Sequence, residues 1–436
     1  MRTRQLIAAL CALSISILTV VIIKPDNSGI STVQSYPATV CPGNLSNGTS
    51  TSVLPSSKLL VRQIPSKKSV LKVAKTSLYL SSIPLLVNGN SENSINVTRS
   101  RSGSLATVIC SISSGDQWFV GGSGSVTSRS SLEIINSGLS TSIVDLIVYS
   151  PNSVSSIISI RISKNSSKRI YLDTLAPGEN SVVIHSITRS GRVTTFLHDQ
   201  SQRGLVNLGA DFVSQGIDPA TRVVIPAISN VMLSGRSTKQ SLRILAPGTV
   251  NANVRAQIVS TDGSFAPIEL DDITIKAGKV KDLTFKPVLQ ARNFALVLNS
   301  DRPIVAAVKS SGSFNGGNEF TWSTSSSELK DMTVYFGGLR PDVVFQGKNF
   351  EVDIQWTDKN RKVYSKTIRN SSGDELAIWQ PKSGVLSARF STANSKVYGG
   401  VIFKEKTGLS YIPLVAGAQL ESAAVPNADA RIITRD

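Results

Sequence analysis

Apolar residues along this chain occur in short runs separated by turn-forming residues. Residues 182–184 (VVI) are followed by the polar stretch 188–192 (TRSGR) and then by the run 193–197 (VTTFL). Such runs, rich in β-branched residues and bounded by Gly, Asn, Asp, Ser or Pro, predict strands joined by turns. No long segment with a 3.6-residue period appears after residue 24. The pattern predicts an all-β protein.

The same pattern repeats along the chain. Residues 131–138 (SLEIINSG) align with residues 241–248 (SLRILAPG), and the stretch around Val144 aligns with that around Val254. A weaker third copy covers residues 385–403. The first two copies lie about 110 residues apart, which suits a sandwich of about seven strands, whereas a β-propeller would need repeats of about 40–50 residues. We therefore expect tandem immunoglobulin-like β-sandwich domains.

The repeats and the composition between them predict the following domain boundaries. Residues 25–57 carry one charge and are rich in Ser, Thr, Gly, Asn and Pro, so we expect a flexible linker there. The predicted organisation is a signal anchor over 1–24, the linker over 25–57, a first β domain over 58–215, second and third β-sandwich repeats over 216–315 and 316–415, and a C-terminal tail over 416–436.

The N-terminus carries a membrane-targeting pattern. Residues 6–23 are uncharged and, as a helix, would cover about 27 Å, enough to cross a hydrocarbon core. Arg2 and Arg4 precede this stretch, and after Lys24 the next cation is Lys58, so we expect the N-terminus in the cytoplasm and the bulk outside. The bulky residues 21–26 offer no signal-peptidase site, which favours an uncleaved single-pass anchor in the cell membrane. The alternative is a cleaved signal and a secreted protein.

Two of the three cysteines lie outside the apolar stretch. In an oxidising compartment, Cys41 and Cys110 predict one disulfide that joins the end of the linker to the first domain. Two free buried thiols are the alternative. A zinc site is a poorer choice, because four ligands are needed and few histidines are available.

The net charge of +17 raises the question of a polyanionic partner. A chain outside the cell does not meet nucleic acid, so we expect none, and anionic cell-wall polymers or lipid head groups remain. One basic run without acids could contact them: Lys58, Arg62, Lys67, Lys68, Lys72 and Lys75. The alternative is a solvated face that only keeps the protein soluble.

The residues that usually carry chemistry do not form a motif. His198 and Asp199 are neighbours on a predicted strand, so their side chains point to opposite faces and are expected at the surface. His185 lies on an adjacent predicted strand and would meet His198 only by chance of register. Asp271 and Asp272 are the one acidic pair, without a calcium-loop pattern. We expect no catalytic, cofactor or metal residues and no cofactor.

The remaining tryptophans offer one further possibility for binding. Trp322, Trp356 and Trp379 could line a sugar-binding strip, although packing in the core is the preferred interpretation for most of them.

Several short motifs resemble a known family. Cys41-Pro42-Gly43 follows the anchor, Cys110 precedes Trp118-Phe119-Val120-Gly121-Gly122, and the turns 136–138 (NSG) and 246–248 (APG) come after them. This layout resembles an uncharacterised family of actinobacterial secreted or membrane-anchored envelope proteins, a domain of unknown function. The resemblance covers about residues 38–310 and implies location and fold. No catalytic residues are established for that family, so it implies none here.

The sequence thus predicts a non-enzymatic, membrane-tethered extracytoplasmic protein. Its tandem β-sandwich domains would bind an anionic cell-wall polymer or an envelope protein, or give structural support in the cell envelope. The alternative is an exported polysaccharide-acting enzyme whose paired carboxylates cannot be identified from sequence.

Overall fold

The structure is a computed structural model that describes residues 32–35, 38–44, 48–55, 59–66, 70–88, 94–100, 104–152, 157–230, 238–314, 317–393, 396–405, 408–415 and 421–424. The chain divides into two compact units. One unit comprises residues 1–35 and 420–436, in which β1 (Thr32–Ser35) pairs antiparallel with β32 (Glu421–Ala424). The other unit, residues 36–419, holds all the remaining described elements.

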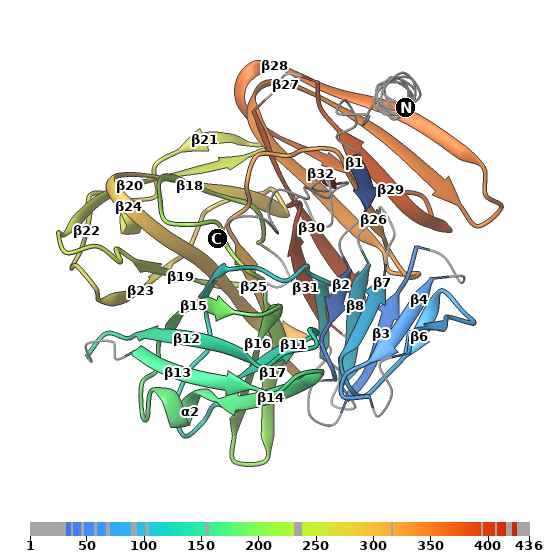
Figure 1. Cartoon of the computed structure of the whole chain (residues 1–436). Coiled ribbons are helices and arrows are strands. Elements are labelled where there is room, and N and C mark those ends of the chain that lie inside the picture. Colours follow the sequence, from blue (N-terminus) through green and yellow to red (C-terminus); the bar gives the residue numbers. More distant parts are fainter. Residues whose placement is uncertain are drawn as a thin grey trace, which may run out of the picture. The chain divides into compact units, whose positions relative to one another are not determined.

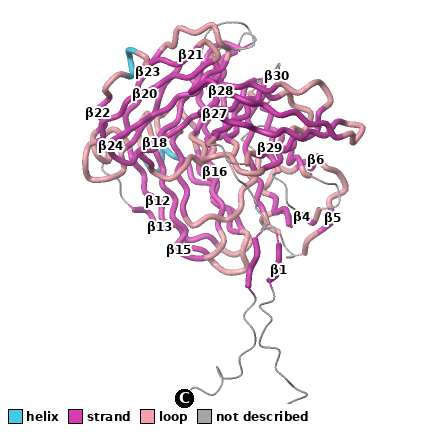
Figure 2. The backbone as a smooth tube through the Cα atoms, turned by 90° about the horizontal axis from the view of Figure 1, so that it is seen from above, coloured by secondary structure: helices cyan, strands magenta, loops and turns pink. Residues whose placement is uncertain are grey.

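The described part of residues 36–419 consists mainly of strands joined by loops, as predicted (Figure 2). The helical elements described there are two short turns, α2 (Leu172–Leu175) and η1 (Ile268–Leu270). No described helix is long and apolar enough to cross a membrane. The predicted signal anchor over 1–24 lies outside the described residues.

The strands fall into four consecutive groups, which we call modules 1 to 4 (Figure 1). Module 1 contains β2 (Thr39–Cys41), β3 (Gly48–Val53), β4 (Leu60–Gln63), β5 (Lys72–Val73), β6 (Leu78–Leu80), β7 (Leu85–Asn88), β8 (Ile95–Ser100) and β9 (Leu105–Ile109). Module 2 contains β10 (Asp116–Val120), β11 (Ser131–Asn136), β12 (Ser142–Tyr149), β13 (Ile157–Ile162), β14 (Ser166–Tyr171), β15 (Val183–Ser190), β16 (Val193–Arg203) and β17 (Val206–Val213).

Modules 3 and 4 follow module 2 directly along the chain. Module 3 contains β18 (Ala220–Ser229), β19 (Lys239–Leu245), β20 (Ala252–Ser260), β21 (Gly263–Phe265), β22 (Ile273–Ile275), β23 (Val280–Phe285), β24 (Asn293–Phe314) and β25 (Gly317–Thr324). Module 4 contains β26 (Met332–Tyr335), β27 (Pro341–Asp358), β28 (Val363–Trp379), β29 (Val385–Ser391), β30 (Val397–Glu405) and β31 (Gly408–Pro413).

All four modules share one strand order. With the strands of module 1 or 2 numbered one to eight along the chain, one antiparallel sheet has the order 1-6-3-4 and the other 5-2-7-8. In module 3, the long strand β24 supplies strands six and seven, and β21 and β22 together take the place of strand four. In module 4, β27 supplies strands two and three, and β28 supplies strands four and five.

The folded hairpin of module 4 shows how one strand can serve two sheets. The register of β27 against β28 shifts between Lys348 and Phe350, and Asn349 between them has φ 46°. Such a bulge bends a strand sharply. The hairpin therefore turns back on itself, and its two ends meet where the rings of Trp356 and Trp379 lie 5.5 Å apart. One hydrophobic core fills the space between the two halves.

The repeats seen in the sequence occupy equivalent places in this order. The aligned segments at 131–138 and 241–248 contain β11 and most of β19, the second strands of modules 2 and 3. The weaker copy at 385–403 contains β29 and most of β30, the sixth and seventh strands of module 4. The immunoglobulin-like part of the prediction is not confirmed, since sheets of order 1-6-3-4 and 5-2-7-8 differ from the ABED and CFG sheets of that fold.

The N-terminal boundary also differs from the expectation. Inside the expected linker over 25–57, residues 39–41 and 48–53 form strands β2 and β3. The expected first domain over 58–215 spans most of module 1 and all of module 2. The polar composition of this segment is compatible with a strand because its polar groups are bonded internally. Asn96 donates to the hydroxyl of Ser50 at 2.7 Å and to the carbonyl of Pro42 at 3.2 Å.

The eighth strands of the modules, which we call the central strands, pack together. β17 contacts both β9 and β25, and β31 likewise contacts both β25 and β9. These contacts run from module 1 through modules 2, 3 and 4 and return to module 1. The four modules of this unit therefore meet along their last strands.

Candidate functional site

A buried polar cluster lies where the central strands meet. Each central strand contributes one side chain: Thr107 from β9, Asp211 from β17, Thr321 from β25 and Ser410 from β31. Thr107 donates to the Ser410 hydroxyl at 2.8 Å, and Ser410 donates to one oxygen of Asp211 at 2.8 Å. Thr321 donates to the other oxygen at 2.7 Å. Residues from all four modules are thus joined through one carboxyl group.

A second acid, Glu319, lies beside this cluster on the same face of β25 as Thr321. Glu319 precedes Thr321 by two residues on β25, and the equivalent positions on the other central strands are Leu105, Gly209 and Gly408. A Cβ atom at Gly209 would lie 2.8 Å from one Glu319 oxygen, and at Gly408 3.0 Å from the other. A side chain at either glycine would therefore crowd Glu319, together with Phe320 at Gly209 and the backbone of Leu105 at Gly408.

Burial raises the pKa of both acids. Despite four hydrogen-bond donors, burial raises the pKa of Asp211 to about 8. Burial also raises the pKa of Glu319 well above its usual value, and the nearby Asp211 carboxylate adds to this shift. The Asp211 carboxyl group is therefore largely protonated at neutral pH. The cluster holds the modules together and is closed to solvent.

The pKa of Asp199 is shifted in the opposite direction. Burial alone would raise its pKa, but the ammonium group of Lys309 and hydrogen bonds from Ser130 and Trp322 hold the pKa below the usual value. Lys309 approaches the carboxylate to 3.2 Å, and the Trp322 indole donates to it at 2.7 Å. This partly buried ion pair links module 2 to module 3.

The prediction that His198 and Asp199 lie at the surface is wrong. Both are buried, because β16 lies inside its sheet between β11 and β17. Their side chains do point to opposite faces: the ring of His198 packs edge-on against Phe212 at 4.6 Å and lies 3.7 Å from Glu133. Burial holds the pKa of His198 well below its usual value, so the ring is neutral.

The second histidine is part of a different sheet. His185 on β15 stacks on Trp118 at 3.9 Å and bonds to Asp116 at 2.7 Å. Because β15 and β16 belong to separate sheets, the two histidines contact different neighbours. In the described part of the chain, no group of three or more His, Cys, Asp or Glu side chains is placed to hold a metal ion. Asp272 instead lies 3.4 Å from Arg255 at the surface.

The other candidate residues are placed as follows. Trp322 and Trp379 are buried, consistent with core packing, and Trp356 stacks on Tyr364 at 5.7 Å. In the basic run, Arg62 is buried and donates to the carbonyl of Ser137 at 2.9 Å, whereas Lys72 and Lys75 are exposed. Lys58, Lys67 and Lys68 lie outside the described residues.

The expected disulfide between Cys41 and Cys110 is present. Both cysteines are fully buried in a hydrophobic core of module 1. The bond joins β2 to the segment that follows β9, so it links the first and last strands of one module.

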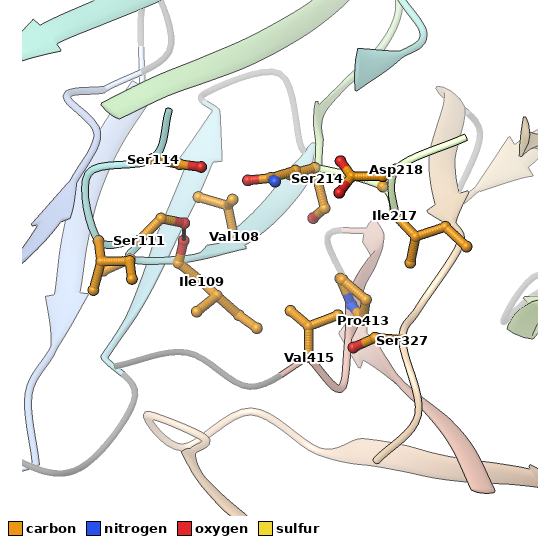
Figure 3. A pocket seen from close by; sticks show the side chains of 14 residues that line it. Val108, Ile109, Ser111, Ser114, Ser214, Ile217, Asp218, Ser327, Pro413 and Val415 are labelled. Carbon is orange, nitrogen blue, oxygen red and sulfur yellow. Dashed lines mark hydrogen bonds between the residues drawn. The ribbon is translucent and has the colours of Figure 1, made fainter. Parts of the chain in front are cut away.

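A cleft opens at the carboxyl ends of the central strands, and we call it the axial cleft (Figure 3). Its volume is about 370 Å³, within the range of small-molecule sites. The ends of β9 and β31 and the segments after β17 and β25 line it, so all four modules contribute. The lining residues are Val108, Ile109, Cys110, Ser111, Ile112, Ser114, Ser214, Gln215, Gly216, Ile217, Asp218, Ser327, Pro413 and Val415.

The lining of the axial cleft is mostly neutral. Apolar side chains alternate with hydroxyl groups, and Asp218 is the one charged side chain among the lining residues. The buried hydroxyl of Ser214 has no hydrogen-bond partner among the described residues. A buried polar group without a partner is a natural contact for a bound ligand or water. Sequence reasoning missed this cleft, because its residues come from four distant segments.

These features define a class: an all-β protein of four repeated modules that converge on a buried polar cluster and a neutral cleft. The chain belongs to the family of unknown function DUF5719, whose model matches residues 90–368. No curated protein matches the chain.

Three solved structures show distant similarity. The crystal structure of Thermotoga maritima 1070 is 15% identical over 25% of this chain and 95% of that one, with a TM-score of 0.20. The α-L-rhamnosidase of Streptomyces avermitilis is 8% identical over 90% of this chain and 58% of that one, with a TM-score of 0.15. A tetra-tandem repeat from the extending region of a large adhesion protein is 11% identical over 88% and 99%, with a TM-score of 0.11. TM-scores this low do not establish a shared fold.

Proposed function

We propose that this protein is an exported, membrane-tethered binding protein of the cell envelope and not an enzyme. The observation that carries the location is the buried disulfide between Cys41 and Cys110. Disulfides persist outside the cytosol, where thiols are not kept reduced. The uncharged stretch 6–23 with Arg2 and Arg4 before it supports export with the N-terminus inside.

The chemistry of the axial cleft supports binding. Glycosidases generally need two carboxyl groups that face each other across the scissile bond, and the lining offers Asp218 alone. Serine nucleophiles need an adjacent base, and no histidine lines the cleft. The buried acids Asp211 and Glu319 are engaged in holding the modules together. The combination of apolar side chains and hydroxyl groups suits a neutral ligand segment.

Location can be tested with alkaline phosphatase fused after the last residue, since this enzyme folds only where its disulfides form. We expect the full-chain fusion to be active and to remain in the membrane pellet after a carbonate wash. Deleting residues 1–24 should abolish activity, because export depends on the apolar stretch. An active fusion without residues 1–24 would contradict export by this segment. Release of the full chain by the wash would contradict the tether.

Binding at the axial cleft can be tested by photo-crosslinking in cells. A benzophenone amino acid at Ser327, an exposed lining residue, should give a discrete adduct, because a bound partner would lie within reach of it. The matched control is the same substitution at Ser190, which is exposed on β15 away from the lining. Equal adducts from both positions, or none from Ser327, would contradict binding at this cleft.

A further inference from the structure

Module 4 contains a second, smaller cleft with a different chemistry. Its volume is about 180 Å³, and three turns or strand ends of one module line it. These are the entry to β27, the turn after β27 and the entry to β29. The lining residues are Gly338, Leu339, Arg340, Pro341, Lys359, Pro381, Lys382, Ser383, Gly384, Val385 and Leu386. We call it the basic cleft, because its charged residues are Arg340, Lys359 and Lys382.

The backbone around the basic cleft is held in place by hydrogen bonds between these segments. Lys359 donates its backbone N–H to the carbonyl of Gly384 at 2.9 Å, which joins two of the turns. The backbone N–H of Lys404 donates to the carbonyl of Arg340 at 3.3 Å, which fixes the third. Because these contacts use backbone atoms, the three cationic side chains are not needed to maintain them.

Two carboxylates that lie close in sequence to the cations of the basic cleft are bonded to other groups. Asp358 precedes Lys359, but its oxygens accept from the backbone of Asn360 at 2.8 Å and from the hydroxyl of Tyr364 at 3.3 Å. Asp342, close to Arg340 in sequence, pairs with Lys404 and accepts from Gln380 at 2.9 Å. Within the described residues, no ion pair to Arg340, Lys359 or Lys382 is present. The cleft therefore concentrates three positive charges without a carboxylate in its lining.

The positive charge continues beyond the cleft. Arg361 and Lys362 lie exposed on the same β27–β28 turn as Lys359. The cleft is also smaller than the roughly 300–1,000 Å³ typical of small-molecule sites. It can therefore hold one acidic group, while neighbouring groups of the same ligand meet the exposed cations outside. An extended polyanion fits this arrangement better than a compact metabolite.

We infer that the basic cleft binds one phosphate group of an extended, phosphate-bearing polymer. Arginine presents a planar fork of N–H donors that matches the two non-bridging oxygens of a chain phosphate, and the two lysines add positive charge beside it. The inference goes beyond the proposed function, because it assigns a second binding site with a different class of ligand. It depends on the proposed function only for the location, the cell envelope, in which the protein would encounter such a polymer.

The test measures binding of fluorescently labelled linear polyphosphate to the purified full chain in a neutral detergent. We expect the variant Arg340→Gln, Lys359→Gln, Lys382→Gln to weaken binding by at least about tenfold. The loss of even one charge-assisted contact to the phosphate would reduce the affinity by about this factor. The slope of log affinity against log salt should fall by roughly two to three. The matched control is Arg161→Gln, Lys276→Gln, Lys286→Gln, which removes the same charges from exposed positions elsewhere and should cost no more than about twofold.

Several results would overturn the inference. Equal weakening by both triple variants would show that net charge, and not the cleft, attracts the polymer. Tight binding of polyglutamate with the same dependence on the three residues would show that the cleft does not select phosphate. Equal affinity for inorganic phosphate would show that no polymer is required. All binding is measured in solution, so a failed export fusion leaves this test intact, and a failed binding test leaves the export result intact.

Discussion

Replacing Asp211 by asparagine should remove much of the loss of folding stability that we expect the protein to show between about pH 4 and pH 8. The pKa of Asp211 is about 8 in the folded chain and about 3.9 in the unfolded chain. Between these values the unfolded chain has released the proton and the folded chain still holds it. Raising the pH through this window therefore favours the unfolded state, by up to about 5 kcal/mol once pH 8 is reached.

Asparagine cannot titrate, so the variant should show a shallower pH dependence. The absolute stability of the variant does not test the pKa of Asp211 directly. The backbone N–H of Trp322 donates to Asp211 at 3.1 Å, and the amide group of asparagine changes this contact as well as the charge. The measurement is urea unfolding at pH 5 and pH 8, followed by tryptophan fluorescence. Asp331→Asn, which removes a surface carboxylate paired with Arg389, serves as control and should leave the slope unchanged. An unchanged slope in Asp211→Asn would show that Asp211 is ionised in the folded protein.

Removing the disulfide should cost about 4 kcal/mol of unfolding free energy. The bond closes a loop with a sequence separation of 69, and cross-links of this length restrict the unfolded chain by about that amount. Both cysteines lie in a small core beside Leu85 and Val61, so replacement by serine also places a hydroxyl in an apolar site. Urea unfolding of the variant Cys41→Ser, Cys110→Ser should show the loss.

A reductant supplies the control for the disulfide. Dithiothreitol should destabilise the wild-type chain by a similar amount and leave the double variant unaffected. A wild-type chain that keeps its stability when mass spectrometry shows both thiols reduced would contradict this account.

Local sequence patterns were enough to predict much of the fold. Short runs of β-branched residues bounded by turn-forming residues predicted the strands, and the alignment of 131–138 with 241–248 found the second strands of modules 2 and 3. Module 1 has the same strand order, but its strands are shorter and its core includes bonded polar groups such as Asn96, so its apolar pattern is weak. Composition alone therefore assigned part of it to a linker.

The candidate sites could not be found in the same way. Thr107 and Ser410 are bonded across a sequence separation of 303, and Asp211 and Ser410 across 199. No periodic pattern reports contacts at such distances. One signal was present, because Asp211 and Glu319 are single acids in otherwise strand-like runs. Burying an acid costs free energy unless neighbouring groups form hydrogen bonds or ion pairs with it, so such an acid indicates a special environment. The cations of the basic cleft come from turns, which sequence reads as ordinary solvated loops.

The return of the central-strand contacts from module 4 to module 1 limits how this protein can change over evolutionary time. In an open stack of repeats, a duplication adds a unit at either end and leaves existing interfaces intact. Here every module has two neighbours, and Ser410 of the last module bonds to residues of the first two. Gain or loss of a whole module by recombination would break these bonds. Divergence within the existing copies, in loops and clefts such as that of module 4, is the route this architecture leaves open.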